Sequence, residues 1–375
     1  MTGRIILLGA TGYTGRLTAE AFVARGERPL LAGRNTRRLA ELAGTLGGLD
    51  TAFADVARPE TVRALLEPGD VLITTVGPFA RLGDAAVEAA IEARAHYIDS
   101  NGEPSFIRRV FERYGDRATD AGVGLLTAFG YDSVPGNLAA AIALRDAGDT
   151  AVRVDIGYFM PGDPRGWMSG GTRASFTASL VEPTFAWRGR IRTERPAARI
   201  RSFELNGRGC SAVSAGSSEH FSLPRLHPQL REVNTYLGYL VRAPRTMQAL
   251  SVLGAGITRA PGVKAGIQAF TTRFAKGSAG GPDIATRSKT GSHIVSITYD
   301  AGGRELTEVH LTGVNGYEFT ARVLAWGASS TIAGGMNGNG ALGPIEAFGF
   351  EQLEAGCAEA GIRCTGPDSG GRRTA

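Results

Sequence analysis

The strongest constraint on the fold is an apolar run that leads into regularly spaced glycines and then into a helix-like segment. The chain opens RIILLGATGYTGRLTAEAF, with Gly9, Gly12 and Gly15 three residues apart. The apolar run indicates a buried strand, and apolar residues recur at helical spacing after the glycines. A strand, a glycine turn and a helix in this order predict the start of a βαβ series.

The same alternation continues to about residue 128. Short β-rich runs are separated by helix-length segments and short connections, as compact α/β units require. This pattern predicts an α/β fold with a Rossmann-type, doubly wound parallel sheet. The runs are RIILL, RPLLA, TAFAD, DVLITT, AHYID and VGLLTA.

The pattern changes near residue 150, where apolar residues begin to alternate with period two. VRVDIGYF, HIVSITYD and ELTEVHLTG alternate in this way, and AGGR between the last two indicates a hairpin turn. RIRSFEL and REVNTYLGYL are further candidate strands. We expect a second, α+β domain with a mostly antiparallel sheet and helices on one face. Helical patterns follow at 316–333 and 344–362.

Four segments follow from these patterns. Residues 1–148 form the Rossmann domain, and residues 149–335 form the α+β domain. Residues 336–365 carry a C-terminal amphipathic helix. Residues 366–375 are rich in Gly, Arg and Ser, and we expect them to be disordered.

The glycine turn has the chemistry of a dinucleotide site. Gly9 permits a tight turn, Gly12 leaves room for a pyrophosphate, and Gly15 lets the helix pack close to the sheet. The first-turn N–H groups and the helix dipole then favour phosphate. The alternative is a turn with a purely structural role. The residues expected at the cofactor are Gly9, Thr11, Gly12, Tyr13, Thr14, Gly15, Arg34, Asp55, Gly77 and Pro78.

The end of the second predicted strand distinguishes NADP from NAD. An NAD site carries an acidic residue there, about 20 residues past the glycines, for the ribose hydroxyls. This chain has Arg34, with Arg37 and Arg38 close by. A guanidinium can bind a 2′-phosphate through two hydrogen bonds. The sequence therefore favours NADP, unless Arg34 is simply a solvated charge.

Two further positions are expected near the dinucleotide. Asp55 follows the third strand, where it would lie beside the adenine or cap the helix that begins near Pro59. Gly77 and Pro78 shape the loop after the fourth strand, at the edge where ligands of open α/β sheets bind.

Composition removes several other classes of function. The net charge is +5 over 375 residues, and no basic run interleaves with aromatic residues, so we expect no nucleic-acid partner. The five histidines and three cysteines show no metal-ligand or disulfide spacing, so we expect no metal. No signal peptide and no stretch of 18 apolar residues is present. We expect a cytoplasmic protein without a transmembrane segment.

Four motifs resemble one protein family. GATGYTG, VGPF, HYIDSNGE and GYDSVPGNLAA occur in this order and at this spacing in saccharopine dehydrogenase-like oxidoreductases. SGGTRAS and GALGPIEAFG are similar to the bacterial branch that includes trans-acting enoyl reductases. The resemblance implies an NADPH-binding Rossmann domain, a second α/β domain, and a C-terminal helix that returns to the first.

The candidate catalytic residues lie in GYDSVPGN. Tyr131, Asp132 and Ser133 follow the sixth strand and precede a helix with Pro135 in its first turn. They could supply the proton that hydride transfer requires, or Asp132 or Ser133 could only cap the helix.

Other polar residues are weaker candidates. Asp99, Asn101 and Glu103 could line the same crevice, whereas Tyr97 lies within a strand and fits a core position. Arg173 could enter from the second domain or be a solvated charge.

One segment has two interpretations. Residues 247–270 could form a lid or a helix on a membrane surface, or an ordinary helix pair broken by glycines and Pro261.

These observations predict an NADPH-dependent reductase that delivers hydride, at the interface between its domains, to an activated C=C bond of a small substrate. The substrate could be lipid-like or carrier-bound. The alternatives are an imine reductase and a non-catalytic NADP-binding protein, and the sequence leaves a homodimer open.

Overall fold

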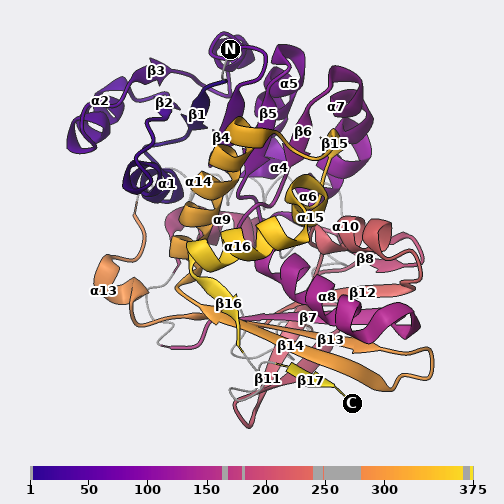
Figure 1. The fold of residues 1–375 in the computed structure, drawn as a ribbon. Helices are drawn as coiled ribbons and strands as arrows, with labels where there is room; N and C mark the ends of the chain where they lie inside the picture. Colours follow the sequence, from indigo (N-terminus) through magenta and orange to yellow (C-terminus); the bar gives the residue numbers. More distant parts are fainter. Residues whose placement is uncertain are drawn as a thin grey trace, which may run out of the picture. The chain divides into compact units, whose positions relative to one another are not determined.

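A computed structural model describes residues 3–162, 168–179, 182–239, 248, 280–365 and 372–374 (Figure 1). The chain divides into two compact units. Unit 1 comprises Met1–Tyr131, Ala279–Gly281 and Gly316–Ala360, and unit 2 comprises Asp132–Ser278, Pro282–Asn315 and Gly361–Ala375.

Unit 1 is built on a parallel sheet. Within the described residues, seven strands lie in the order β15-β6-β5-β4-β1-β2-β3, and every pairing is parallel. The predicted doubly wound sheet is confirmed, including all six strands expected before residue 128. The strands are β1 (Ile5–Leu8), β2 (Leu30–Gly33), β3 (Thr51–Phe53), β4 (Val71–Thr74), β5 (His96–Asp99), β6 (Gly124–Leu126) and β15 (Gly340–Ala341).

Helices cover both faces of this sheet. The chain moves one way from β1 through β2 to β3 and the opposite way from β4 to β6, so right-handed crossovers put α1 and α5 on opposite faces. The central strands are continuous apolar runs because both faces are covered. The helices are α1 (Tyr13–Ala24), α2 (Thr36–Thr45), α3 (Pro59–Arg63), α4 (Phe79–Leu82), α5 (Asp84–Ala93), α6 (Pro104–Arg109) and α7 (Gly115–Ala121), with a π-helical turn at Val110–Tyr114.

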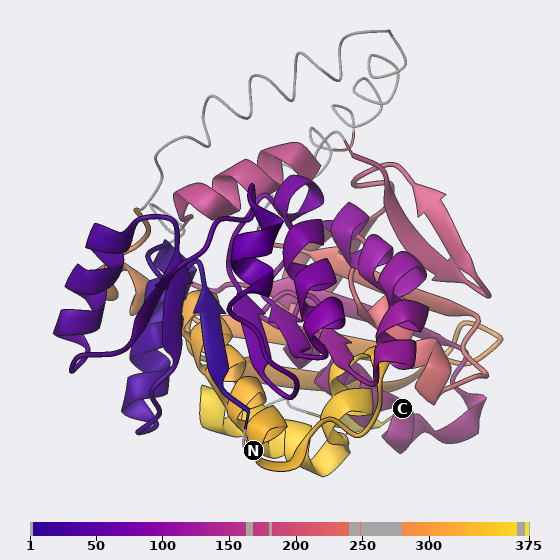
Figure 2. The same ribbon diagram turned by 90° about the horizontal axis from the view of Figure 1, so that it is seen from above.

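A helix from late in the sequence completes unit 1. Helix α14 (Gly316–Gly334) packs against α1, β1, β4 and β5, and Figure 2 shows it in gold beside the yellow α16. The Ser329 hydroxyl donates to Glu27 at 2.6 Å, and the Trp326 ring packs against Phe129 and Phe348. The sequence assigned 316–333 to the second domain, whereas these contacts place α14 in unit 1.

The last helical pattern forms two helices. Helix α15 (Pro344–Phe348) ends at Gly349, whose φ of +80° breaks the run before α16 (Phe350–Ala360). Both belong to unit 1. The units divide after Tyr131 and Asn315, away from the expected boundaries at 148 and 335. As limits of independently folding domains, those boundaries stay predictions.

Unit 2 contains a mixed sheet. Ten described strands take part, with β10-β11-β12-β7-β13-β14-β16 as the main order and β8, β9 and β17 beside it. All pairings are antiparallel except β12 with β7, and AGGR forms the predicted hairpin between β13 and β14. The strands are β7 (Arg153–Phe159), β8 (Thr184–Arg188), β9 (Ile191–Glu194), β10 (Ile200–Leu205), β11 (Arg208–Ala215), β12 (Glu232–Leu237), β13 (Ser292–Tyr299), β14 (Glu305–Gly313), β16 (Ile362–Cys364) and β17 (Arg372–Thr374).

The position of α8 matters most for function. Helix α8 packs on β7, β13 and β14, and the Thr307 hydroxyl donates to the Ala143 carbonyl at 2.9 Å. Helix α10 packs against α8, β8 and β12. The described helices of unit 2 are α8 (Val134–Ala147), α9 (Gly170–Ser179), α10 (Glu219–Leu226) and α13 (Ile284–Arg287), with a 3-10 turn at Gly148–Thr150.

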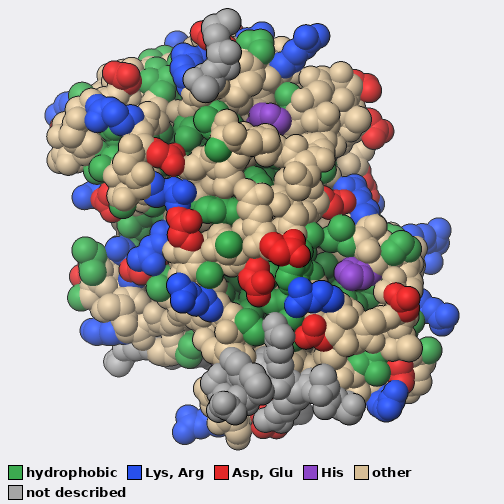
Figure 3. Space-filling model, in the orientation of Figure 1, with side chains coloured by type: hydrophobic (Ala, Val, Ile, Leu, Met, Phe, Trp, Pro, Cys, Tyr) green, Lys and Arg blue, Asp and Glu red, His purple; other side chains and the backbone are tan. Residues whose placement is uncertain are grey.

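Two expectations concern segments that are only partly described. Arg372–Thr374, in the tail expected to be disordered, pair with β14 as β17, and the other seven tail residues lie outside the described residues. Residues 247–270 also lie outside them, apart from residue 248. Among described residues, no helix is long and apolar enough to cross a bilayer. Charged side chains of both signs are interspersed on the face drawn in Figure 3.

Candidate functional site

The turn after β1 brings the three glycines together. Gly9 has a φ of +87°, and its N–H donates to the Ala32 carbonyl on β2 at 2.9 Å. A Cβ on Gly9 would lie 2.8 Å from the Val76 side chain and 2.9 Å from the Thr75 hydroxyl. Glycine is therefore required here by both the backbone conformation and the close approach of the loop after β4.

The other two glycines differ in what surrounds them. A Cβ on Gly15 would lie 2.3 Å from the Gly9 carbonyl oxygen, so Gly15 lets α1 pack onto the turn. Among the described residues, a Cβ on Gly12 would meet only that same oxygen, at 3.2 Å, and would otherwise point into open space. Gly12 is thus not required by packing, and the open space above it fits an approaching pyrophosphate.

The first turn of α1 is suited to an anion. Gly12 is the N-cap residue, and no side chain caps this end of the helix within the described part of the chain. Thr11, Tyr13 and Thr14 are all partly exposed around it. The Tyr13 ring makes an edge-to-face contact with Tyr317, with centroids 5.1 Å apart. The residues present fit the phosphates of a dinucleotide at this helix end.

Arg34 lies at the end of β2, on the same edge of the sheet. Its side chain is exposed and makes no hydrogen bond or ion pair within the described ranges. Arg37 is paired with Glu41 at 3.5 Å, and the Arg38 N–H donates to the Asn35 side chain, which caps α2. Arg34 is thus available for a phosphate ligand.

Asp55 does not cap α3. Its carboxylate accepts from the Ala57 N–H at 3.0 Å, and the N-cap residue of α3 is Arg58. The capping alternative for Asp55 was therefore wrong, because the chain makes an extra turn before the helix begins. A place for Asp55 beside the adenine stays a prediction.

A buried carboxylate shapes the loop that holds Gly77 and Pro78. Glu103 is 1% exposed, and its two oxygens accept from the Phe79 and Ala80 N–H groups, each at 2.9 Å. The Gly77–Pro78 peptide bond is cis, and Gly77 is exposed at the carboxyl end of β4. Glu103 thus fixes the loop through its two main-chain hydrogen bonds, and it does not line a crevice.

Asp99 also has a structural place. It is fully buried and accepts from the Tyr97 and Thr127 hydroxyls and from the N–H groups of Asn101 and Ala128, at 2.8–2.9 Å. Burial raises the pKa of Asp99 to about 6 although these donors lower it. Asp99 therefore joins the ends of β5 and β6. The suggestion that Asp99, Asn101 and Glu103 line the site was wrong, because all three are buried.

The polar cluster of unit 2 begins at Asp132, just before α8. The Tyr239 hydroxyl, beyond the end of β12, donates to Asp132 Oδ1, and the Ser217 hydroxyl donates to the Asp132 carbonyl at 3.0 Å. Burial raises the pKa of Asp132, and the Tyr239 hydrogen bond opposes this shift. The Asp132 carboxyl thus accepts from a tyrosine, one residue before the N-cap of α8.

Ser133 occupies the N-cap position of α8, but its side chain does not cap the helix. Its hydroxyl instead contacts the Ser218 hydroxyl, and Asn137 Nδ2 lies within 3.3 Å of both serine oxygens. The capping role considered for Asp132 and Ser133 was therefore wrong. Ser133 is completely buried in a serine–asparagine network.

Tyr131 belongs to unit 1, whereas the polar cluster that begins at Asp132 belongs to unit 2. It is the last residue of the first segment of unit 1, 6% exposed, and its N–H donates to Thr320 on α14 at 3.1 Å. Arg173 is exposed on α9. A direct part of Tyr131 in catalysis stays a prediction.

Two residues that the sequence did not suggest, Glu219 and Tyr158, form a buried contact in unit 2. Glu219 in α10 is completely buried, and the Tyr158 hydroxyl of β7 donates to its Oε1 at 2.5 Å. Burial raises the pKa of Glu219 to about 7, although the Ser217 and Tyr158 hydroxyls lower it. The other oxygen, Oε2, has no hydrogen-bond partner among the described residues. Glu219 is therefore a buried acid whose protonated and ionised forms are both populated at neutral pH.

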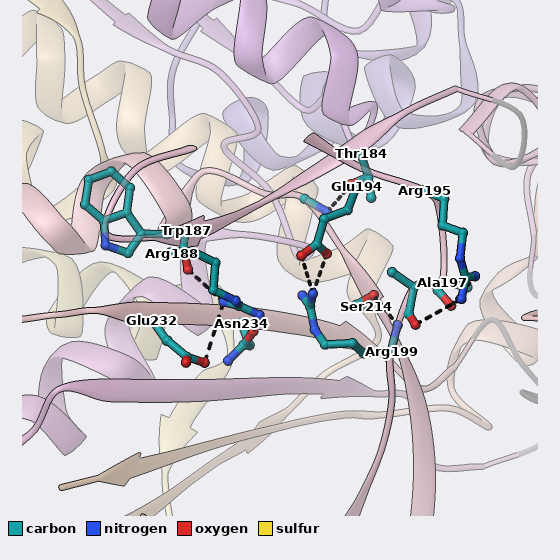
Figure 4. A network of polar contacts seen from close by, with 12 residues as sticks. Thr184, Trp187, Arg188, Glu194, Arg195, Ala197, Arg199, Ser214, Glu232 and Asn234 are labelled. Atoms are coloured by element: carbon teal, nitrogen blue, oxygen red, sulfur yellow. Dashed lines mark hydrogen bonds and ion pairs between the residues drawn. The ribbon is translucent and has the colours of Figure 1, made fainter. Parts of the chain in front are cut away.

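Another polar network in unit 2 is structural (Figure 4). The Glu194 carboxylate, at the end of the β8–β9 hairpin, accepts hydrogen bonds from the Arg199 guanidinium on both of its oxygens. Arg188 donates to Asn234 Oδ1 at 2.6 Å. Arg188 also lies 3.8 Å from Glu232. In this network Glu194 and Glu232 are each paired with an arginine. Across the described residues, no group of three or more His, Cys, Asp or Glu side chains is arranged to hold a metal ion.

Comparison with protein families identifies the first part of the chain. The model of the saccharopine dehydrogenase NADP binding domain matches residues 5–126. Residues 5–126 are a saccharopine dehydrogenase-type NADP-binding domain. This match covers β1 to β6, the glycine turn and Arg34, so the expected preference for NADP over NAD agrees with the family.

Curated relatives extend the similarity beyond this domain. A putative trans-acting enoyl reductase of Mycobacterium tuberculosis (strain ATCC 25618 / H37Rv) is 37% identical over 184 residues. A trans-acting enoyl reductase of Mycobacterium ulcerans (strain Agy99) is 32% identical over 184 residues. Each match covers 47% of this chain and 44% of the relative, less than half of either protein.

One solved structure has the same fold over its whole length. Apo saccharopine dehydrogenase (L-Glu forming) from Saccharomyces cerevisiae aligns over 100% of both chains with a TM-score of 0.58 and 14% identity. At this identity the likeness concerns the fold. The predicted resemblance to saccharopine dehydrogenase-like oxidoreductases is confirmed.

Proposed function

We propose that this protein is an NADPH-dependent reductase of activated C=C bonds in enoyl-type substrates. The observation that carries the proposal is the NADP-binding domain of residues 5–126, joined to relatives that bear the name trans-acting enoyl reductase. Bound NADPH would supply a hydride to the carbon β to the substrate carbonyl.

The chain's own residues supply the rest of the chemistry. The turn at Gly9–Gly15 and α1 bind the pyrophosphate, and Arg34 binds the 2′-phosphate. The loop at Gly77 and Pro78 forms the edge along which the nicotinamide half lies, as in other open α/β sheets. Binding at these points fixes the orientation of the nicotinamide.

The reaction also consumes one proton, which forms the second new C–H bond, at the carbon α to the carbonyl. We assign that proton to Asp132 together with Tyr239. The Tyr239 hydroxyl holds the Asp132 carboxyl in one orientation, and burial makes that carboxyl a weaker acid than an exposed one. Ser133 is fully buried, and we give it no direct part.

A substrate panel tests the proposal. The purified protein is mixed with NADPH and with enoyl thioesters of graded chain length, free or on an acyl carrier protein, and NADPH absorbance is followed. Cyclic imines form the second arm of the panel. Oxidation by enoyl thioesters supports the proposal. Oxidation by imines alone would make the protein an imine reductase, and tight binding of NADPH without oxidation by either arm would indicate a non-catalytic NADP-binding protein.

A further inference from the structure

A glycine from late in the sequence packs on the first residue of α1. Gly281 belongs to unit 1, although Pro282, the next residue, belongs to unit 2. A Cβ on Gly281 would lie 2.5 Å from Cδ2 of Tyr13 and 2.6 Å from both Cε2 and Cγ of the same ring. The main chain at Gly281 therefore lies directly against the Tyr13 ring, beside the glycine turn.

The close contact, and not the backbone conformation, is what requires glycine at position 281. The φ of Gly281 lies outside the left-handed region, so a larger residue would not strain the main chain. An added Cβ would still force the Tyr13 ring or the chain to shift. Gly280 has no such contact, because a Cβ there would meet nothing within 4 Å among the described residues.

The chain that follows Gly281 is anchored by contacts of its own. Pro282 is buried, and its ring fixes the backbone angle φ. The Pro282 carbonyl accepts from Arg287 Nη1 at 3.0 Å, and the Asp283 side chain caps α13. Because these contacts limit movement of the main chain, we expect the partly exposed Tyr13 ring to shift when a Cβ is added at position 281.

The place of the Tyr13 ring bears on the anion site at this helix end. Tyr13 follows the N-cap residue Gly12, and its ring contacts both Gly281 and Tyr317. The Cα–Cβ bonds of a helix tilt toward its N-terminus, so a side chain on the first residue lies beside that end. A displaced ring would remain there and crowd the first-turn N–H groups that face an anion.

We propose that Gly281 is a further determinant of dinucleotide binding, as a positioning residue that keeps the Tyr13 ring clear of the pyrophosphate at the first turn of α1. The inference rests on the proposed function for the phosphate site at this turn. Since NADPH and NADH share the pyrophosphate, Gly281 acts equally on both, whereas Arg34 acts on the 2′-phosphate alone.

The first test is Gly281→Ala, which adds only the Cβ. Fluorescence titrations with NADPH and with NADH should both show an affinity about tenfold lower or more, the value of one hydrogen bond to a charged group. Gly280→Ala is the matched control, because it makes the same change at the neighbouring residue without the contact. It should leave both affinities unchanged. Melting temperatures show that each variant is folded.

The second test asks whether Gly281 acts through Tyr13. Tyr13→Ala removes the ring that the added Cβ would displace. Gly281→Ala should therefore cause little further loss of affinity in the Tyr13→Ala background, whatever affinity Tyr13→Ala itself has. A full additional loss in that background would overturn the inference, since Gly281 would then act by another route.

Gly12→Val separates failure of this inference from failure of the phosphate site. Loss of NADPH binding in Gly12→Val with normal affinities in Gly281→Ala would overturn the role of Gly281 and leave the phosphate site in place. A loss confined to NADPH in Gly281→Ala would also overturn it, because the effect would then lie at the 2′-phosphate. If Gly281→Ala weakens both cofactors and no thioester oxidises NADPH, the inference stands and the proposed reductase function fails.

Discussion

Tyr239 and Asp132 are 107 residues apart in the chain and are joined by a hydrogen bond from the tyrosine hydroxyl to the carboxylate. The contact connects the segment after β12 with the start of α8. Reduction of the double bond also needs a proton at the α carbon, and an acid that a second side chain orients can supply it. The first prediction concerns this pair.

Asp132→Asn should lose most of the reductase rate, by about 100-fold or more, because an amide cannot supply the proton. Tyr239→Phe should lose less, since it removes the orienting hydrogen bond and leaves the acid. NADPH affinity should be unchanged in both, since the phosphate-binding turn is untouched. Steady-state kinetics and NADPH fluorescence titration measure the two effects. Full activity in Asp132→Asn would remove Asp132 from the mechanism.

Gly12 and Gly15 should respond differently to substitution. Gly12→Val should leave the protein folded and abolish NADPH binding, because its side chain enters the open space above the turn, where the pyrophosphate must approach. Gly15→Ala should destabilise the fold by about 1–3 kcal/mol, since its Cβ would lie 2.3 Å from the Gly9 oxygen. Thermal unfolding and NADPH titration separate these outcomes. A folded Gly12→Val protein with normal NADPH affinity would show that the phosphates bind elsewhere.

Arg34 should set the preference for NADP over NAD. Arg34→Ala should weaken NADPH binding by about 1.5–3 kcal/mol, the value of a charged hydrogen bond, and leave NADH affinity nearly unchanged. Arg37→Ala is the matched control, because Arg37 is paired with Glu41 on α2. It should change the NADPH to NADH affinity ratio little. An unchanged NADPH to NADH affinity ratio in Arg34→Ala, or a wild type that prefers NADH, would contradict the assignment.

Glu219 should make the fold less stable as pH rises. Its folded pKa of about 7 is above the ordinary value of 4.5, so the folded state binds more protons than the unfolded state between these values. Stability is therefore highest below the ordinary pKa and falls as pH rises toward the folded pKa. The total loss is on the order of 3 kcal/mol.

Glu219→Gln should remove this loss, so the variant should be more stable than the wild type above pH 7 and similar to it near the ordinary pKa of a glutamate. Chemical denaturation at several pH values measures the difference. Parallel stability curves for the two proteins would show that Glu219 is not protonated in the fold.

The sequence predicted those parts of the molecule that depend on neighbouring residues. Strand β1, the turn and α1 lie within 20 residues, and the roles of Gly9 and Gly15 follow from backbone geometry at that turn. Strand β1, with IILL, is a continuous apolar run near the middle of the sheet, which is the pattern of a strand covered on both faces, whereas β3 at the edge is largely exposed.

Residues that meet only through the fold could not be predicted in this way. Tyr158 and Glu219 are 61 residues apart, and Glu219 follows two serines at the start of a helix, which is an ordinary capping pattern. Tyr239 lies just past a strand and has no motif around it. For α14, the helical pattern was visible, but its packing against α1 depends on a long-range return of the chain.

The most direct test of the central claim is the transfer of hydride itself. The protein is incubated with an enoyl thioester and NADPH deuterated at the hydride-donating carbon, and the product is analysed by mass spectrometry and NMR. The account predicts one deuterium at the β carbon, one solvent proton at the α carbon, and no transfer by Gly12→Val. NADPH that binds tightly but never passes deuterium to any thioester of the panel would contradict it.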